Sequence, residues 1–300
     1  MKTHTACLIF NPVAGKGNAD AELRTIFQLL SPQIKLDIRY TQPDVSATEL
    51  AKAAIADGVD LVIASGGDGT ISAAAKALVH TEIPLGIIPR GTANAFAAAL
   101  GISDKIPEAC DAILNGVTRV IDAASCNDQP TILLTGMGWE AEAVENADRE
   151  AKNWFGFLAY VLSGFEKLWD MHSFTAQIEI EGEVTEIKAL AVTIANAAPP
   201  SSVLAQGPAG VLVDDGKLDV TIISTANEIG ALQAVSSLMG GALLGTAANR
   251  EDIVYLRAKD IKITATPPQK VAIDGELKDE IPCLNFRCLP LALQVVVPQV

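Results

Sequence analysis

The feature that most constrains the fold of this chain is a glycine-rich turn that directly follows an apolar run. Residues Leu61 to Ala64 are apolar and lack helical periodicity, which is typical of a strand buried on both faces of a parallel sheet. Residues 66–69 then read Gly-Gly-Asp-Gly, and an alanine-rich helix is predicted from Ile71 to Val79. Glycines let a ligand approach the backbone, and the N–H groups at a helix start attract anions. The turn therefore predicts a phosphate-binding site.

Asp68 is the unusual residue of this turn. A carboxylate repels phosphate unless it also holds a metal ion, a water or a sugar hydroxyl, so Asp68 suggests a Mg-nucleotide rather than bare phosphate. Taken alone, the motif is also compatible with an ordinary strand-to-helix turn rich in glycine.

Two further loops of the same kind flank this turn in the sequence. The apolar run Ala6 to Phe10 leads into Asn-Pro-Val-Ala-Gly-Lys-Gly at 11–17, and the run 84–89 leads into Arg-Gly-Thr-Ala-Asn at 90–94. Because the carboxyl ends of parallel strands meet at one sheet edge, where nucleotides bind, we expect the three loops to lie together. Neither the P-loop pattern nor the dinucleotide Gly-x-Gly-x-x-Gly pattern is present.

In order and spacing, these loops resemble the catalytic domain of the diacylglycerol kinases and related bacterial lipid kinases. The shared segments are Asn-Pro-x-x-Gly at 11–15, Gly-Gly-Asp-Gly-Thr at 66–70 and Pro-x-Gly-Thr-x-Asn at 89–94. The resemblance continues with Gly-x-Gly-aromatic-Glu-Ala at 136–141, Gly-x-x-x-Tyr at 156–160, Asp-Gly-Lys-Leu-Asp-Val at 215–220 and Asp-Gly-Glu at 274–276. The Gly-Gly-Asp-Gly motif also resembles that of NAD kinases and phosphofructokinases.

The order of the expected elements predicts an α/β fold followed by a β fold. Strands and helices alternate up to about Arg119, which is typical of a parallel α/β architecture, and short β-rich segments with turn signals follow from about Val120. Those segments are expected at 174–181, 184–195, 217–224, 260–266, 270–274 and 283–288 and predict an antiparallel sandwich. The resemblance implies a three-layer α/β ATP-binding domain at 1–121, a β-sandwich lipid-substrate domain at 122–288, and an active site in the cleft between them. It also implies that 289–300 returns to the first domain, with 291–297 as the returning strand.

The composition indicates a soluble enzyme. The 300 residues, 49% of them hydrophobic, can bury a large core and fit two domains better than one. A formal net charge of -14 argues against nucleic acid, and five scattered cysteines fit reduced thiols rather than a disulfide framework. The apolar run before Asn11, residues 6–10, has only five residues, too few for a signal peptide core. We expect a cytoplasmic location, and the oligomeric state stays open.

Two segments of the β-rich half bear on a lipid substrate. The aromatic-rich stretch 153–169 has helical periodicity, so it is either a core-packing helix or a helix whose rings line the entry of an acyl chain or contact a bilayer. The stretch 229–249 is uncharged but contains four glycines, which makes it a poor membrane span. A packed helix is favoured there, with transient lipid contact as the alternative.

The resemblance also implies roles for individual residues in phosphoryl transfer from ATP with Mg²⁺. Contacts with ATP are implied for Asn11, Pro12, Val13, Ala14, Gly15, Thr41, Gly66, Gly67, Asp68, Gly69, Thr70, Ile71 and Thr92. Asp68 is also implied as a catalytic residue near the metal and the phosphates. Lys16 could add positive charge, or could be an ordinary solvated lysine.

Two acidic loops of the second half complete the implied site. Glu276 is favoured as the base that takes the proton of the lipid hydroxyl, with Asp274 as the second candidate, and a β-turn with exposed acids is the alternative. A structural Mg²⁺ is implied at Leu212, Asp215 and Lys217, where the first and last residues would contribute carbonyl oxygens.

Two departures from the family pattern leave more than one function open. The family usually has Asp and Arg where this chain has Ala95 and Ala98, and Asp where it has Glu140. The favoured hypothesis is an ATP-dependent kinase of diacylglycerol or a similar lipid, presented from a membrane or micelle with peripheral membrane contact. The alternatives are a soluble-substrate kinase such as an NAD kinase, and a catalytically silent regulator that binds nucleotide or lipid.

Overall fold

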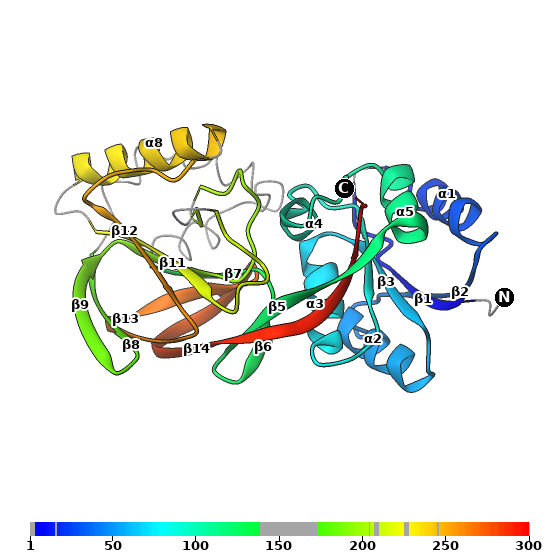
Figure 1. The fold of residues 1–300 in the computed structure, drawn as a ribbon, viewed down its shortest axis with the longest axis horizontal. Coiled ribbons are helices and arrows are strands. Elements are labelled where there is room, and N and C mark those ends of the chain that lie inside the picture. Colours follow the sequence, from blue (N-terminus) through cyan, green and yellow to red (C-terminus); the bar gives the residue numbers. More distant parts are fainter. Residues whose placement is uncertain are drawn as a thin grey trace. The chain divides into compact units, whose positions relative to one another are not determined.

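The computed structural model describes residues 4–15, 17–138, 173–203, 205–206, 210–224, 228–244 and 246–299 (Figure 1). The chain divides into two compact units, Met1–Ala123 with Leu291–Val300, and Ala124–Pro290. The chain passes between the units within two strands, β5 (Val117–Cys126) and β14 (Glu276–Val297), which pair with each other. Lys16, Glu140 and the aromatic segment 153–169 lie outside the described residues.

The first unit is built on a parallel sheet. Its strands are β1 (His4–Phe10), β2 (Ile34–Tyr40), β3 (Leu61–Gly66), β4 (Leu85–Pro89) and the end of β14, in the order β2-β1-β3-β4-β14. The pairs β1–β2, β1–β3, β3–β4 and β4–β14 are all parallel. All residues of β3 and β4 are buried, because helices cover both faces of the sheet. The parallel α/β prediction is confirmed.

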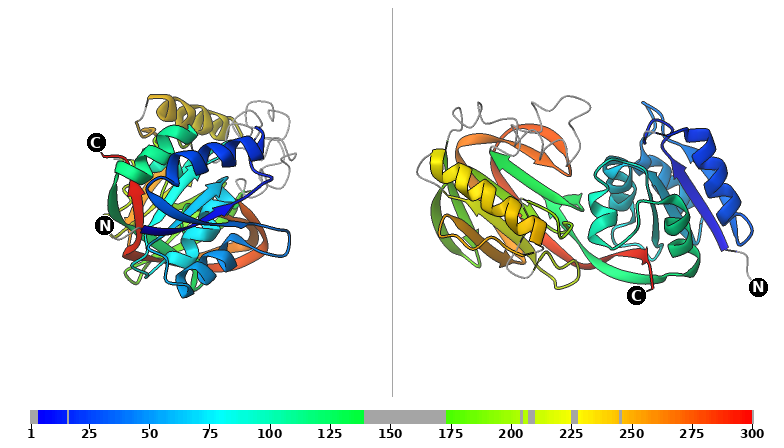
Figure 2. Two further views of the ribbon diagram at one scale, coloured as in Figure 1. Left: turned by 90° about the vertical axis from the view of Figure 1, so that its right-hand side faces the viewer. Right: turned by 90° about the horizontal axis from the view of Figure 1, so that it is seen from above.

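Four helices cover this sheet in pairs. Helix α1 (Ala19–Leu30) packs beside α5 (Ile106–Asn115) on one face, and α2 (Ala47–Ala56) packs beside α3 (Asp68–Leu78) on the other (Figures 1 and 2). Helix α2 begins with a capping box in which the side chains and backbones of Ser46 and Glu49 bond reciprocally. A short helix, α4 (Ala95–Ala99), follows β4 and contacts α3. Helix α3 overlaps the helix predicted from Ile71 to Val79 but begins three residues earlier, at Asp68.

The second unit is antiparallel and rich in β-structure. Its main strand order is β12-β11-β10-β7-β13-β14, with β8 paired with β13, β9 paired with β8, and the short β6 (Gln129–Thr131) paired with β5. The bounds are β7 (Leu134–Gly138), β8 (Phe174–Ile180), β9 (Glu183–Ala189), β10 (Ala191–Ala195), β11 (Leu218–Ile223), β12 (Ile253–Ala258) and β13 (Asp260–Ile273). These strands share a core that includes Met137, Phe174 and Leu284.

Strand β13 pairs with different neighbours along its length. Residues 262–266 pair with β8, and residues 271–273 pair with β7. The ladder with β14 is irregular around Pro267 and Pro268, which lack the N–H that a ladder position needs. The change of partner allows one strand to contribute to both layers of β-structure around the core.

The sequence and the structure differ in where strands begin and end. The expected strand 184–195 is two strands, β9 and β10, separated at Leu190. The expected segments 260–266 and 270–274 belong to the single strand β13, and 283–288 and 291–297 both belong to β14. Turn residues such as proline interrupt a sequence pattern, but long-range pairing keeps these strands continuous.

Helix α8 (Glu228–Leu244) corresponds to the expected packed helix at 229–249. Its Ala234 and Leu238 are fully buried and belong to an apolar cluster with Leu190 and Ile223. Among the residues described, no helix is both long enough and apolar enough to cross a membrane.

Candidate functional site

The carboxyl edge of the parallel sheet brings the predicted glycine loops together. The backbone N–H of Asn11 donates to the carbonyl of Ser65 at 2.9 Å, and its side-chain amide donates to Oγ1 of Thr70 at 2.8 Å. The N–H of Arg90 donates to the carbonyl of Gly66 at 2.7 Å. The N–H of Thr41 donates to the carbonyl of Phe10 at 3.0 Å. Residues that follow four different strands therefore form one continuous surface.

Glycine is required where the second and third loops touch. A Cβ atom on Gly91 would lie 2.7 Å from the Cα atom of Gly67, and one on Gly67 would lie 3.3 Å from the Cα atom of Gly91. The two backbones are thus in direct contact, and a side chain at either position would separate them. By contrast, a Cβ atom on Gly69 would meet no atom within 4 Å, so this glycine borders open space.

The start of helix α3 is suited to an anion. The helix begins at Asp68, and its N-cap residue, Gly67, makes no side-chain capping bond. An uncapped helix start presents N–H groups and the positive end of the helix dipole. Ile71 is an exception among the predicted contact residues, because its side chain is fully buried and its N–H donates to the carbonyl of Gly67 at 3.0 Å. Ile71 thus supports the turn from the core side, and its contact with ATP stays a prediction.

Asp68 connects the second loop to the third. Its Oδ1 atom accepts a hydrogen bond of 3.2 Å from the backbone N–H of Phe96, near the start of α4. Burial raises the pKa of the Asp68 carboxyl above its ordinary value, while the backbone N–H groups around Phe96 oppose this shift. A partly buried carboxylate beside an anion-binding helix start suits a phosphate that arrives together with a cation. The chemistry of the donors therefore fits Mg-ATP.

The third loop is closed by Asn94 rather than by Thr92. Asn94 has a left-handed φ of 48°, its Oδ1 accepts the N–H of Gly91 at 2.8 Å, and its amide donates to the carbonyl of Gly91 at 3.1 Å. Thr92 is exposed and free to face a ligand. Ala95 is 2% exposed, whereas Ala98 is exposed. The carboxylate that the family usually carries at position 95 would thus occupy a buried position.

The two acids of the Asp-Gly-Glu segment have opposite environments. Asp274 and Gly275 have φ values of 48° and 81°, as a two-residue turn between β13 and β14 requires. The Asp274 carboxylate is buried and accepts hydrogen bonds from the Thr131 hydroxyl at 2.8 Å and from the N–H groups of Ile132 at 3.1 Å and Leu133 at 2.8 Å. Asp274 thereby fixes the turn to the segment before β7, and its oxygens are directed at donors of the protein itself.

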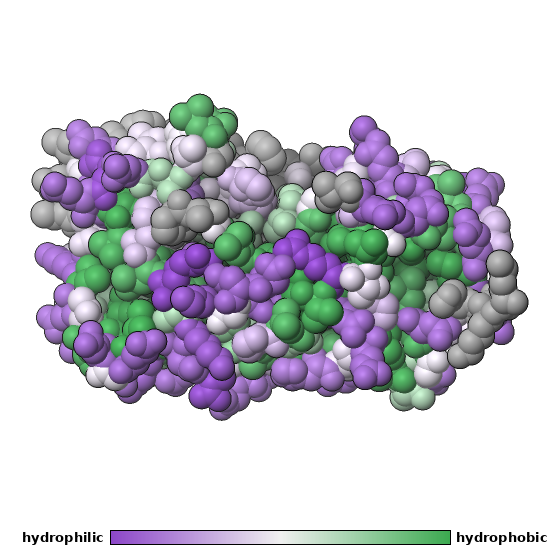
Figure 3. Space-filling model, in the orientation of Figure 1, coloured by the Kyte–Doolittle hydropathy of each residue, from purple (hydrophilic) through white to green (hydrophobic). Residues whose placement is uncertain are grey.

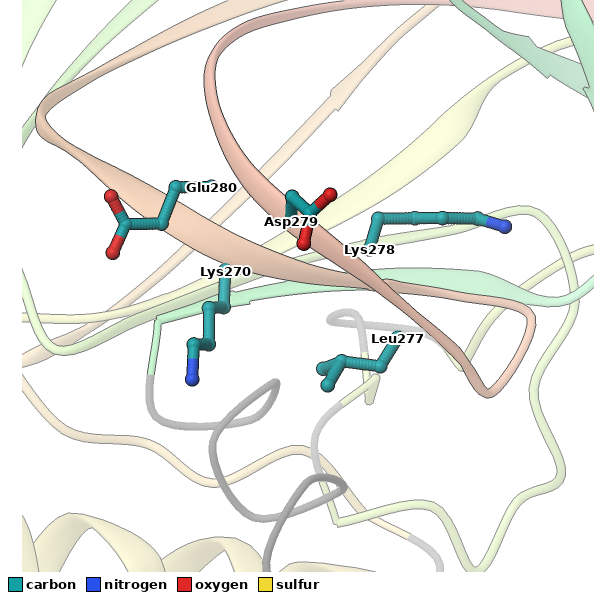
Figure 4. Close-up of a pocket in the computed structure, with 5 residues that line it drawn as sticks. All are labelled: Lys270, Leu277, Lys278, Asp279 and Glu280. Carbon is teal, nitrogen blue, oxygen red and sulfur yellow. The ribbon is translucent and has the colours of Figure 1, made fainter.

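Glu276 keeps a solvent-facing carboxylate. Its side chain is 69% exposed, and its Oε2 atom lies 3.1 Å from the Lys278 ammonium. A hollow of about 570 Å³ adjoins the same hairpin and is lined by Lys270, Leu277, Lys278, Asp279 and Glu280. Figure 4 shows Lys270 and Leu277 extending to the same side of the hairpin. Neither acid of the Asp-Gly-Glu turn lines this mainly charged hollow, so we assign it no substrate.

At the predicted structural metal site, the Asp215 carboxylate already has partners. Its Oδ1 accepts the N–H of Lys217 at 3.1 Å, and its Oδ2 lies 2.5 Å from Nη2 of Arg257. The Nε atom of Arg257 lies 3.0 Å from Asp219, whose carboxyl is 2% exposed and whose pKa burial raises to about 6. Leu212 is exposed, and no group of three or more metal-binding side chains occurs among the residues described. As arranged, the side chains fit a guanidinium, and a Mg²⁺ ion at Asp215 would either share this carboxylate with Arg257 or displace Arg257 from it.

Fold and loops together define a class of protein: a parallel α/β unit with glycine-bearing loops at the carboxyl edge of its sheet, followed by an antiparallel β unit. Comparison with known families gives the same two parts. The Diacylglycerol kinase catalytic domain matches residues 5–126, and the YegS C-terminal NAD kinase beta sandwich-like domain matches residues 134–297. The chain belongs to the diacylglycerol kinase-like family.

Several relatives match along almost the whole chain. A diacylglycerol kinase of Bacillus subtilis is 31% identical over 98% of this chain and 96% of its own length. An uncharacterized protein of Synechocystis is 47% identical over 99% of this chain and 71% of its own length. The crystal structure of a diacylglycerol kinase from Bacillus anthracis superposes with a TM-score of 0.75 at 25% identity, covering 99% of this chain and 98% of that one. A second structure from that organism gives a TM-score of 0.82 at 27% identity with the same coverage.

Proposed function

We propose that this protein is an ATP-dependent lipid kinase that transfers the γ-phosphoryl group of ATP to a hydroxyl of diacylglycerol or a similar lipid. The observation that carries the proposal is the uncapped start of α3, which lies beside the contact between Gly67 and Gly91. This arrangement offers backbone N–H groups to phosphates without side-chain obstruction. Membership of the diacylglycerol kinase-like family supports the same assignment.

In this proposal the loops of the first unit bind and orient ATP. Backbone groups of 11–15 and 66–70 contact the phosphates, and Thr41 and Thr92 contact other parts of the nucleotide. Mg²⁺ would be held near Asp68 and would neutralise phosphate charge during transfer. Asp68 also fixes the start of α4 through the Phe96 N–H, so it contributes to the shape of the loop as well as to its charge.

Glu276 is proposed as the base that accepts the proton of the lipid hydroxyl. Its carboxylate is exposed and has acceptor capacity beyond its contact with Lys278. Asp274 remains the second candidate, but its oxygens already accept three donors from residues 131–133. We assign Asp274 the role of holding the turn that presents Glu276.

A lipid substrate requires contact with a membrane or micelle, and we propose peripheral contact by a protein that works in the cytoplasm. Leu243 and Leu244, at the end of α8, are 86% and 78% exposed. Figure 3 shows apolar surface over this end of α8. Exposed leucines on an uncharged helix end suit shallow insertion among lipid headgroups. Wild type should float with diacylglycerol-containing phosphatidylcholine vesicles, and Leu243→Ser with Leu244→Ser should reduce the floated fraction.

One experiment separates the proposed function from its alternatives. The protein is incubated with labelled ATP and Mg²⁺, with or without a whole-lipid extract, and the labelled products are identified. We expect a labelled phospholipid that requires the extract. Labelled NADP from added NAD would instead show a soluble-substrate kinase. ATP binding without turnover would show a silent regulator, which is the outcome that Ala95 and Ala98 favour.

A further inference from the structure

Arg90 stands at the phosphate-binding edge but is turned into the protein. It directly follows β4, where an arginine would ordinarily be assigned to a phosphate. Its side chain, however, is only 1% exposed. A guanidinium so deeply buried does not reach a ligand at the loop surface.

The donors of Arg90 are directed at the first loop and at helix α1. Nη1 donates to the carbonyl of Asn11 at 2.9 Å, and Nη2 donates to the carbonyl of Ala14 at 3.0 Å. Nε and Nη2 both lie 2.6 Å from Oε2 of Glu22, which belongs to the first turns of α1. The guanidinium carbon lies 4.1 Å from the centre of the Phe10 ring, which adds a cation–π contact.

These contacts fix the direction of the peptide groups in the first loop. In a trans peptide the N–H points opposite to the carbonyl that precedes it. Because the Ala14 carbonyl points at Arg90, the N–H of Gly15 points away from Arg90. Gly15 has a left-handed φ of 89°, which a residue with a side chain would adopt only with strain, so this loop conformation also depends on the glycine.

We propose that Arg90, held by Glu22, is a positioning residue for nucleotide binding: it locks the loop 11–15 in the conformation that presents its backbone to the phosphates. This inference rests on the proposed nucleotide binding but adds residues that no shared motif assigns. Arg90 acts through the loop and does not touch the nucleotide. Without Arg90 the loop samples other conformations. The apparent affinity for Mg-ATP then falls in proportion to the fraction of molecules whose loop keeps the binding conformation.

Lysine is not an adequate replacement in this geometry. A guanidinium has five N–H donors on three nitrogens in a planar fork, and all three nitrogens of Arg90 are used here, whereas the three donors of an ammonium leave from one nitrogen and do not reproduce this spacing. We therefore expect Arg90→Lys to weaken Mg-ATP binding by about tenfold or more, measured by titration calorimetry. Glu22→Gln, which leaves the arginine charge without its partner, should weaken binding in the same direction by a smaller factor.

Arg39→Lys is the matched control. Arg39 lies in β2 and pairs with Asp37 at 2.7 Å and with Asp57 at 2.5 Å. Like Arg90, it is an arginine of the first unit that bridges more than one acceptor. Both of these partners of Arg39 lie outside the glycine loops. Arg39→Lys should lower the melting temperature without changing the affinity for Mg-ATP, whereas Arg90→Lys should change both.

Hydrogen exchange in the absence of nucleotide tests independently whether Arg90 holds the loop 11–15 in one conformation. The amides of Asn11, Val13, Ala14 and Gly15 should exchange faster in Arg90→Lys than in wild type and in Arg39→Lys. Wild type that does not bind Mg-ATP would overturn the proposed function. Wild-type binding together with equal affinity in folded Arg90→Lys would overturn only this inference, as would unchanged exchange of the loop.

Discussion

The glycine loops of the first unit and the Asp274–Glu276 turn of the second unit form their candidate sites in different ways. In the first unit, backbone groups from four strand ends meet because the parallel sheet aligns those ends. In the second unit, Asp274 is buried by donors 141 to 143 positions away in the chain, and Glu276, two residues later, is exposed. A strand-end site therefore follows from topology, whereas the role of a single acid depends on its own long-range contacts.

The largest effect on turnover is expected at Glu276, in the second unit. Glu276→Gln keeps the size of the side chain and removes its basicity, so kcat should fall by about 10² while the affinity for ATP stays nearly constant. Because the side chain is exposed, the substitution should not destabilise the fold, and an unchanged melting temperature would confirm this. The measurement is lipid-dependent turnover at saturating ATP.

Asp274→Asn is the control for this prediction. The amide would place an N–H₂ group or a weaker acceptor against the donors of Thr131, Ile132 and Leu133, so the free energy of unfolding should fall by about 1–3 kcal/mol. Turnover per folded molecule should fall less than in Glu276→Gln. If Asp274→Asn abolishes turnover and Glu276→Gln does not, the base is Asp274, and the two acids have the reverse roles.

The sequence predicts the first unit more completely than the second for a physical reason. Short apolar runs and glycine turns are local signals, and the parallel order of their strands brings the loops to one edge. The buried state of Asp274 has no such signal, because its donors lie in the distant segment 131–133. The same limit applies to Arg90, whose partner Glu22 is 68 positions away. It also applies to β14, whose continuity depends on pairing with other strands.

The next effect is expected at Asp68, in the first unit. Asp68→Ala removes the charge beside the turn that is proposed to bind phosphate, so turnover should fall by about tenfold or more. Loss of the bond to the Phe96 N–H should also lower the free energy of unfolding by about 1 kcal/mol, as for a lost helix cap. Turnover and thermal unfolding are measured on the same sample. Wild-type turnover in this variant would remove Asp68 from the site.

Because burial raises the pKa of the Asp68 carboxyl, protonation should occur at a higher pH than for an exposed aspartate. As the pH falls through this raised pKa, the charge is lost and Mg-ATP binding should weaken. Asp68→Ala should lack this step in the pH profile of the affinity. An identical acid-side step in the variant would assign the titration to another group.

Gly69 tests whether the open side of the first-unit turn is the ligand side. It lies in the first turn of α3 with space for a Cβ atom, so Gly69→Ala should stabilise the fold by about 0.5–1 kcal/mol through helix propensity. A methyl group in that space should nevertheless reduce Mg-ATP affinity several-fold. Denaturant unfolding and calorimetric titration measure the two effects separately. Greater stability with unchanged affinity would mean that phosphates do not approach this face.

The smallest effect is expected at Asp215, where the second unit again depends on a distant partner. Arg257 pairs with the Asp215 carboxylate that the resemblance assigns to Mg²⁺, so Mg²⁺ should raise the melting temperature of wild type only slightly. Arg257→Met removes the competing cation and should increase this Mg²⁺-dependent rise. Asp215→Ala should abolish it, and KCl at equal ionic strength corrects for screening. Equal rises in wild type and Arg257→Met, with none in Asp215→Ala, would show that Mg²⁺ binds without displacing Arg257. Equal rises in all three would show that no Mg²⁺ site exists at this loop.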